Sequence, residues 1–505
     1  MIDLATERDP ETLRQVAQLQ DREIARLIKD NAHLRTELAR LQGQTPGGVQ
    51  QELELIKELL AQREQELFGR SSEKRPTPDS EERSATREAT TPRRGHGPRP
   101  QASLPMVEEV RTLAEESRDC PACGGHVTEM KGQTEDSEEI TVIERQFVLK
   151  TIKRQKYRCQ CNSAVVTAPA SPKLIPGGRY TPELAIHVAI AKYADHMPLE
   201  RQVAAMARVG LEVCSQTLWD QILALAGHLT PSYEALYQRA LQAEVVGGDE
   251  TRWPLLTGGT SSYYAWSLTS PDVAFYQISK GRSTNEARAL LGSYQGVVMA
   301  DGYSVYASLA RESRFELVHC WAHVRRKFFE AQQNAPQATH ALDLIGQLYE
   351  VEREVPALSP RAGPEDHATA RALRQTLREE RSRPIIAALR DWAYQIKPTL
   401  LPQSGIGKAV DYMLSLWPGL TRFLVDPRVP LDNNATERSL RGLVVGRKNH
   451  YGSKSLRGCQ VAAIFYSLVE SAKLVGVNPH AYLLRATYEA LANPGTVTLP
   501  TDLLA

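Results

Sequence analysis

Residues 432–448 read DNNATERSLRGLVVGRK and place one acidic side chain, Glu437, among asparagines and arginines. Two more acids each close a short apolar run that predicts a buried strand, Asp249 after residues 245–248 and Asp301 after residues 297–300. Three carboxylates at one point repel each other unless divalent cations neutralise them, and hard oxygen ligands suit Mg²⁺. A two-metal site for phosphoryl transfer is therefore the first hypothesis.

Each acid also has a purely structural interpretation. If Asn434 is the N-cap of a helix, Glu437 falls at the capping-box position, and it can also pair with Arg441 one turn later. Asp249 and Asp301 can belong to turns, because Asp and Gly favour turn conformations. The residues alone leave both interpretations open.

Six motifs lie along the chain: 67–74 (LFGRSSEK), 248–251 (GDET), 301–303 (DGY), 320–328 (CWAHVRRKF), 432–438 (DNNATER) and 446–453 (GRKNHYGS). In this order they resemble the IS66 family of bacterial insertion-sequence transposases, and the likeness runs nearly from end to end. The resemblance implies an Asp-Asp-Glu triad on an RNase H-like fold, carried by Asp249, Asp301 and Glu437. It also implies cleavage of transposon ends and strand transfer into target DNA, with two Mg²⁺, or Mn²⁺, per active site.

Length and composition set the broad class of the protein. A chain of 505 residues predicts roughly two to four domains. The 61 Lys and Arg nearly balance the 60 Asp and Glu, so only local clusters can indicate nucleic-acid binding. Residues 1–10 carry acids and no apolar signal core, and no long uncharged apolar run follows. We expect a cytoplasmic bacterial protein without a membrane partner, associated with the nucleoid when it is bound to DNA.

The predicted fold is an α/β RNase H-like catalytic core with an all-helical insertion, preceded by a coiled coil, a small zinc-binding domain and a helix-turn-helix-like helical domain. The expected boundaries are 1–70 for the coiled coil, 71–104 for a disordered linker, 105–172 for the zinc-binding domain, 173–240 for the helical DNA-binding region, 241–333 for the first part of the core, 334–430 for the insertion, 431–490 for the second part of the core and 491–505 for the tail.

A heptad pattern over residues 13–41 predicts the coiled coil, and with it a homodimer or higher oligomer. Leucines fill most d positions, and Asn31 at an a position favours a defined register. A lone amphipathic helix that packs on its own chain is the alternative. Residues 71–104 are rich in Pro, Ser, Thr and Arg, which predicts a disordered linker.

Four of the seven cysteines lie in one segment and predict one structural Zn²⁺. The second pair has one intervening residue instead of two, so His126 is an alternative fourth ligand. Reduced, metal-free cysteines are the other alternative. The expected ligands are Cys120, Cys123, Cys159 and Cys161.

A basic segment follows the first cysteine pair. Residues 140–157 alternate like a strand, and Lys153, Arg154 and Lys156 are expected to contact phosphates. A solvated strand face is the alternative. The resemblance implies that this zinc-binding module recognises transposon ends.

Residues 210–219 resemble the turn and second helix of a helix-turn-helix, with Ser215 as the N-cap. This predicted helix carries few cations, so DNA contact and simple helical packing both remain open. Residues 334–429 have helical periodicity and predict a bundle, which by the family resemblance helps to hold transposon ends.

Cations surround the acidic site in the sequence and suit a polyanionic substrate, because arginine forks match phosphate oxygens. His323 and Asn434 are expected to position the metal ligands, although a metal site of Cys320 with His319 or His323 is also possible. Glu470 is a rival third acid without comparable Asn and Arg surroundings. The cations expected to contact DNA here are Arg325, Arg326, Lys327, Arg438, Arg441, Arg447 and Lys448.

Two other functions compete with a transposase. The zinc module, the helix-turn-helix and the coiled coil would also serve a DNA-binding regulator or architectural protein whose acids are structural. The second competing function is that of a nuclease that cleaves DNA without strand transfer. The resemblance also implies accessory proteins encoded by the same element.

Overall fold

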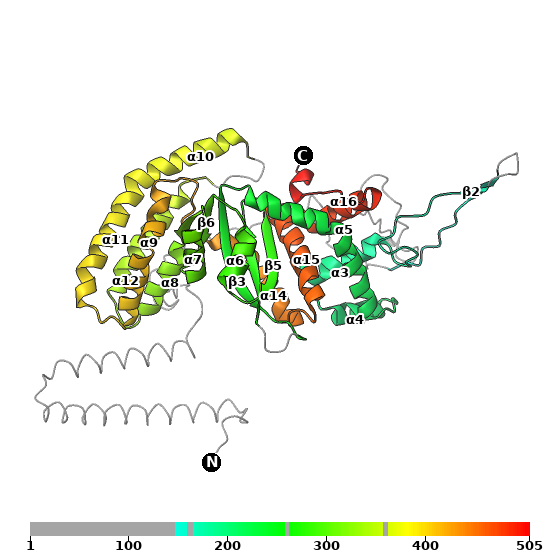
Figure 1. Ribbon diagram of the computed structural model, residues 1–505, viewed down its shortest axis with the longest axis horizontal. Coiled ribbons are helices and arrows are strands. Elements are labelled where there is room, and N and C mark those ends of the chain that lie inside the picture. The colour runs from blue at the N-terminus through cyan, green and yellow to red at the C-terminus, as the bar shows by residue number, and fades with distance from the viewer. Residues whose placement is uncertain (1–146, 159–164, 258–261, 357–361, 505) are drawn as a thin grey trace, which may run out of the picture. The chain divides into compact units, whose positions relative to one another are not determined.

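The computed structural model describes residues 147–158, 165–257, 262–356 and 362–504 (Figure 1). The predicted coiled coil of 1–70 and linker of 71–104 lie outside these residues. So do all the expected zinc ligands, Cys120, Cys123, Cys159, Cys161 and the alternative His126. Within the described residues, no helix is long and apolar enough to cross a membrane.

A five-stranded mixed sheet forms the centre of the fold, in the spatial order β5-β4-β3-β6-β7. Strands β3, β4 and β5 form an antiparallel meander, and β6 and β7 continue the sheet parallel to β3. At the start of the crossover helix α6, Ser283 and Glu286 form a capping box. The strands and this helix are β3 (Val245–Trp253), β4 (Tyr263–Thr269), β5 (Ala274–Lys280), α6 (Thr284–Leu291), β6 (Val297–Ala300) and β7 (Glu316–His319).

Strand β3 is longer than its apolar run predicts, because Gly247 and Gly248 continue the strand instead of starting a turn. A Cβ atom at position 247 would lie 2.0 Å from Thr436 Oγ1, and one at position 248 would lie 3.1 Å from the Tyr306 ring. Glycine in a strand often marks such a close approach of another element. The prediction that Asp249 closes its strand is therefore wrong, since the strand runs four residues beyond it to Trp253.

Helix α15 (Leu456–Leu474) lies along the edge strand β5 (Figure 1). The Ala274 and Tyr276 N–H groups of this edge donate to the hydroxyls of Ser471 (3.0 Å) and Ser467 (2.8 Å). An uncovered edge strand would expose unpaired backbone groups to other chains. The serines of α15 satisfy part of that edge and bury it.

Helix α5 continues well beyond the predicted helix-turn-helix, from Ser215 to Leu241. Its later half packs on the sheet, where Tyr233 and Tyr237 stack on Phe275. Ser215 is not the N-cap as predicted, because the helix begins one residue earlier than expected and Cys214 takes the cap position. The helices of this region are α3 (Pro182–Tyr193), α4 (Leu199–Arg208), α5 (Ser215–Leu241) and α16 (Pro479–Ala492).

The described part of the insertion is helical, as predicted, and contains no strand. It shares one apolar core with α8, β6 and β7, so it packs on the β7 side of the sheet (Figure 1). The helices on this side are α7 (Ser304–Glu312), α8 (Trp321–Ala331), α9 (Ala338–Arg353), α10 (Pro364–Leu377), η2 (Arg378–Ser382), α11 (Arg383–Ile396), η3 (Lys397–Thr399), α12 (Gly405–Ser415), α13 (Trp417–Thr421) and η4 (Arg422–Leu424).

The predicted basic strand over 140–157 is mostly absent from its described part. Only β1 (Lys156–Arg158) forms there, paired antiparallel with β2 (Val165–Thr167). Val148 and Leu149 are 79% and 80% exposed, so no apolar face packs residues 147–155 into a sheet. The short 3-10 helix η5 (Pro500–Leu503) ends the described chain near α16.

Candidate active site

Strand register brings the first two acids to the same level of the sheet. Parallel strands β3 and β6 pair Gly247 with Met299, and Asp249 and Asp301 each lie two residues further along. Because side chains alternate between faces with a period of two, both acids project on the same side. Asp301 directly follows β6, as predicted.

The third acid lies close enough to act on the first. Burial raises the pKa of Asp249 to about 7, and the negative charges of Glu250, Asp301 and Glu437 add to the shift. Like charges within several ångströms disfavour ionisation in this way. The three predicted acids therefore share one electrostatic environment.

Glu437 lies in α14 (Asn434–His450), but not in the capping box considered above. The N-cap is Asn433, so Glu437 is one position too far along the helix to reach the cap. Its Oε1 atom is buried without a hydrogen-bond partner, and Nε2 of His323 lies 3.7 Å away. A buried carboxylate oxygen left unpaired by its own helix is available to a ligand.

Hydrogen bonds to strand β3 and to the start of helix α8 hold the start of α14 against the sheet. The buried Asn433 side chain donates to Gly248 O (3.2 Å), next to Asp249 in β3. The Asn433 backbone N–H donates to Cys320 Sγ (3.1 Å), and Trp321 N–H donates to Leu431 O (3.1 Å). The helix that carries Glu437 is thus tied both to the strand of Asp249 and to the start of α8.

Asn434 was expected to position the metal ligands. Its hydrogen bonds instead go to Asp432, two residues earlier in the chain. Its backbone N–H and side-chain amide donate to the two carboxylate oxygens of Asp432 (3.0 and 2.5 Å). The neighbouring Asn433 is the residue that reaches the sheet. Its buried position depends on tertiary packing, and the sequence offers no signal that separates the two asparagines.

Sequence reasoning missed a cluster beside Asp301 that forms around the buried side chain of Glu250. Arg282 forms an ion pair with Glu250 and lies 3.8 Å from the centre of the Tyr303 ring. Tyr306 OH donates to Glu250 Oε2 (3.0 Å), and Tyr303 N–H donates to Asp301 Oδ1 (2.9 Å). The fourth acid of the site is therefore already neutralised by a protein cation. The motif GDET was the only signal for Glu250.

The helical insertion also reaches the site. Tyr412 of α12 accepts a hydrogen bond from Gly302 N–H (3.2 Å), immediately after Asp301. A Cβ atom at position 302 would lie 2.7 Å from the Tyr412 ring, so the tyrosine requires glycine there. His319 at the end of β7 is buried, and burial lowers its pKa.

Residues 177–461, more than half of the chain, match the family model described as "Transposase IS66 family". The chain belongs to the IS66 transposase family. It is 31% identical over 422 residues to the uncharacterized protein y4jD of Sinorhizobium fredii, covering 79% of this chain and 80% of that protein. The uncharacterized proteins y4hP and y4qI of the same organism are 29% and 30% identical over 75% and 78% of this chain, and 71% and 74% of their own lengths.

The cations of this IS66 transposase fall into two groups. Arg438, Arg441 and Lys448 are exposed at spacings that put them on one face of α14. Arg447 instead donates to Thr251 Oγ1 (3.0 Å) and to Arg252 O, so it ties α14 to β3. A side chain held in this way is a structural contact of the fold.

The other predicted DNA-contacting residues lie at two places. On α8, Lys327 lies 3.8 Å from Glu330, Arg326 is exposed and Arg325 is half-buried. Around β1, Lys153 and Lys156 are exposed, whereas Arg154 donates to Ala168 O (2.7 Å). The exposed members of these two groups, Arg326, Lys327, Lys153 and Lys156, can contact phosphates at the protein surface.

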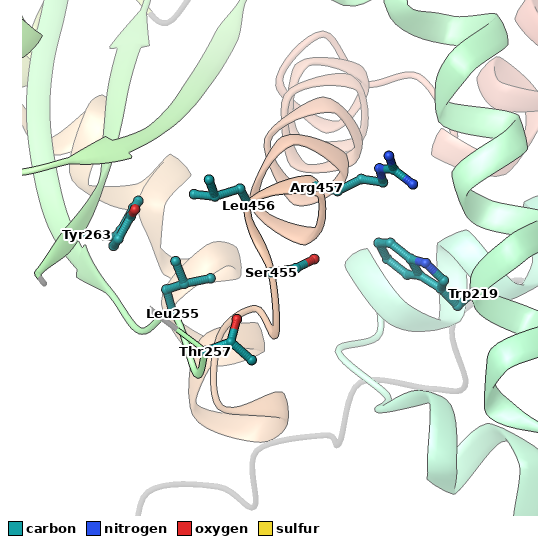
Figure 2. A pocket seen from close by; sticks show the side chains of 7 residues that line it. All are labelled: Trp219, Leu255, Thr257, Tyr263, Ser455, Leu456 and Arg457. Atoms are coloured by element: carbon teal, nitrogen blue, oxygen red, sulfur yellow. The ribbon is translucent and has the colours of Figure 1, made fainter. Parts of the chain in front are cut away.

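Figure 2 shows a hollow of about 600 Å³ between the start of α5, the ends of β3 and β4, and the start of α15. Two aromatic side chains, one cation and two aliphatic hydroxyls lie beside two leucines. It is lined by Trp219, Leu255, Thr257, Tyr263, Ser455, Leu456 and Arg457.

Glu470, the rival third acid, lies elsewhere in the transposase. It is on α15, where its Oε1 accepts from Lys473 Nζ (2.9 Å). Its charge raises the pKa values of Tyr276 and Tyr466, after the larger effect of burial. A lysine already pairs this carboxylate.

Proposed function

We propose that this chain is a DDE-type transposase that cleaves transposon ends and transfers the freed strand into target DNA. The observation that carries the proposal is the meeting of Asp249, Asp301 and Glu437, seen in the strand register and in the raised pKa of Asp249. The sheet supports an RNase H-like core, since a three-strand antiparallel meander is followed by two parallel strands on the far side of β3.

The three acids fit a divalent metal centre. Asp249 is held beside the carboxylates of Asp301 and Glu437, whose negative charges raise its pKa, a state that bound cations relieve. Asp249, Asp301 and Glu437 would hold two Mg²⁺ or Mn²⁺. When bound, such ions would activate a water molecule for attack on DNA and stabilise negative charge on the reacting oxygens.

The protein's own residues keep this centre in place. Asn433 fixes α14 to β3, and Arg282 neutralises Glu250, so that the neighbouring charge does not compete for the cations. Tyr303 N–H orients Asp301, and Tyr412 supports the turn that follows it. The chain thus presents a rigid set of oxygens and leaves the chemistry to bound metal and DNA.

The exposed cations of α14 suit the phosphates of transposon-end and target DNA. In the hollow of Figure 2, Trp219 and Arg457 suit an unstacked base and its phosphate. Dimerisation through residues 1–70, end recognition by a zinc-binding module and accessory proteins belong to the same proposal.

Substitution of the acids tests the function directly. We expect Asp249→Asn and Glu437→Gln to abolish Mg²⁺-dependent cleavage and joining of end-containing DNA, because each removes a metal-binding charge, while DNA binding persists. The assay is gel analysis of labelled end DNA with Mg²⁺ and with a chelator.

Glu470→Gln is the matched control, since it removes a carboxylate of α15 outside the site. Full strand transfer by either acid variant would refute the assignment. Binding of end DNA without any metal-dependent cleavage by the wild-type chain would favour the regulator instead.

A further inference from the structure

A second group of metal-binding side chains lies on the other side of Glu437. Cys320 precedes α8, His323 lies in its first turn, and Glu437 comes from α14. One ligand atom of each residue lies within 4.8 Å of the other two. Thiol, imidazole and carboxylate thus converge from two segments more than a hundred residues apart.

Two of these groups lack partners. His323 Nδ1 and Glu437 Oε1 are both buried without a hydrogen bond. His323 Nε2 and Glu437 Oε1 are 3.7 Å apart, which is too far for a hydrogen bond. The unpaired Glu437 Oε1 thus faces the Nε2 side of the His323 ring, and a cation between them would satisfy an imidazole nitrogen and a carboxylate together.

The Cys320 thiol gives up its proton only to a bound cation, because burial raises its pKa to about 12. Its side chain is almost fully buried, 1% exposed, and its Sγ accepts from Asn433 N–H (3.1 Å). Cys320 is also the N-cap of α8, where the helix dipole favours negative charge. A metal that binds here displaces the thiol proton to solvent, as coordinating cysteines require.

We propose that Cys320, His323 and Glu437 bind one Zn²⁺ and leave a fourth position open. Sulfur and nitrogen donors select zinc over magnesium, which prefers oxygen ligands alone. Ligands about 2.0–2.3 Å from zinc lie roughly 3.3–3.6 Å from one another in a tetrahedron, so the observed group needs only a small contraction. Three protein ligands with an open position are typical of zinc sites that admit water or substrate.

The zinc would fix Glu437 in relation to α8. The carboxylate that acts electrostatically on Asp249 would then be held by zinc through its Oε1 atom. The inference stands without the proposed function, because zinc binding needs no DNA and no catalysis.

The experiment counts zinc in the full-length chain. The chelator-treated protein is dialysed against Zn²⁺, and the bound metal per chain is measured for the wild type, Cys320→Ser and His323→Ala. We expect each variant to bind one zinc fewer than the wild type. Zinc held by the predicted 105–172 module is common to all three proteins, so the difference isolates the site.

Co²⁺ identifies the ligands. We expect the thiolate-to-cobalt absorption of the wild type to exceed that of Cys320→Ser by one cysteine. His323→Ala, on a partly exposed helical turn, keeps the measurement usable if Cys320→Ser fails to fold. Cys459→Ser is the matched control, because it replaces another buried cysteine that lies outside the group.

Equal zinc content in the wild type and both variants would overturn the proposal. So would loss of this zinc in Asp301→Asn with retention in His323→Ala, since the acids alone would then hold it. Retention of zinc by Asp301→Asn supports the Cys–His–Glu site, and it does so even if the chain shows no cleavage of DNA.

Discussion

Asn433 shows how one side chain can assemble a site without entering its chemistry. Its amide joins α14 to Gly248, and its backbone N–H contacts Cys320. The side chain is 3% exposed, so no water replaces the bond if the amide is removed. Asn433 is therefore a positioning residue for Glu437.

Asn433→Ala is expected to destabilise the fold by about 1–3 kcal/mol, because a buried hydrogen bond is lost. It should also reduce cleavage about a hundred-fold by misplacing Glu437, and raise the Mg²⁺ concentration that gives half-maximal activity. Denaturant titration and metal-dependent kinetics measure these effects. Asn449→Ala, at an exposed position of the same helix, should leave the Mg²⁺ requirement unchanged. An unchanged Mg²⁺ requirement in Asn433→Ala would contradict the positioning role.

His450 makes stability depend on pH. Burial lowers its pKa to about 4, and the charges of Lys192 and His196 add to the shift. An unfolded histidine titrates near 6.5, so between these values the unfolded state binds the extra proton. The free energy of unfolding should therefore fall as the pH drops from about 6.5 to about 4, by at most about 3 kcal/mol.

Urea unfolding at several pH values measures this loss. His450→Gln should flatten the curve in that window, whereas His480→Gln, at an exposed position, should follow the wild type. Identical pH dependence in wild type and His450→Gln would show that another group is responsible.

At the scale of elements, the helical insertion depends on one buried ion pair. Arg378, fully buried in the turn of π-helix between α10 and α11, donates to both carboxylate oxygens of Glu352 (2.6 and 3.0 Å) and to Phe423 O (2.8 Å). Without Arg378, Glu352 would keep only the longer contact of its Oε2 with Arg374 Nε (3.5 Å), so most of the compensation for its charge would be lost.

Arg378→Ala is expected to cost about 3–5 kcal/mol of stability. The control Arg381→Ala breaks the exposed pair with Glu354 and should cost at most about 1 kcal/mol. Thermal unfolding followed by circular dichroism compares the two variants. Similar losses for both would mean that burial adds little to the Arg378 pair.

The elements themselves were largely predictable. Strand β6 and the helical insertion occur where local periodicity predicts them, because short-range patterns decide such elements. Gly247 and Gly248 were misjudged, since their place in β3 depends on Thr436 and Tyr306 packing over them. The predicted recognition helix is likewise the first part of α5, whose later turns are held by the sheet.

At the scale of the whole molecule, the candidate site joins three distant parts of the chain. Asp301 and Glu437 are separated by the whole insertion, which packs on β6 and β7 and reaches back to Gly302 through Tyr412. The insertion is thus part of the wall of the site. Membership of the IS66 transposase family is consistent with one such assembly over residues 177–461.

The sequence by itself indicated strand β6, the helical insertion and the three candidate acids, because apolar periodicity and motif order are properties of neighbouring residues. Only the tertiary structure decided that Asn433 rather than Asn434 reaches the sheet and that Arg447 donates to Thr251 of β3. It also decided that Cys320 and His323 lie close to Glu437. These contacts join residues far apart in the chain, and their partners are chosen by packing, which no local pattern encodes.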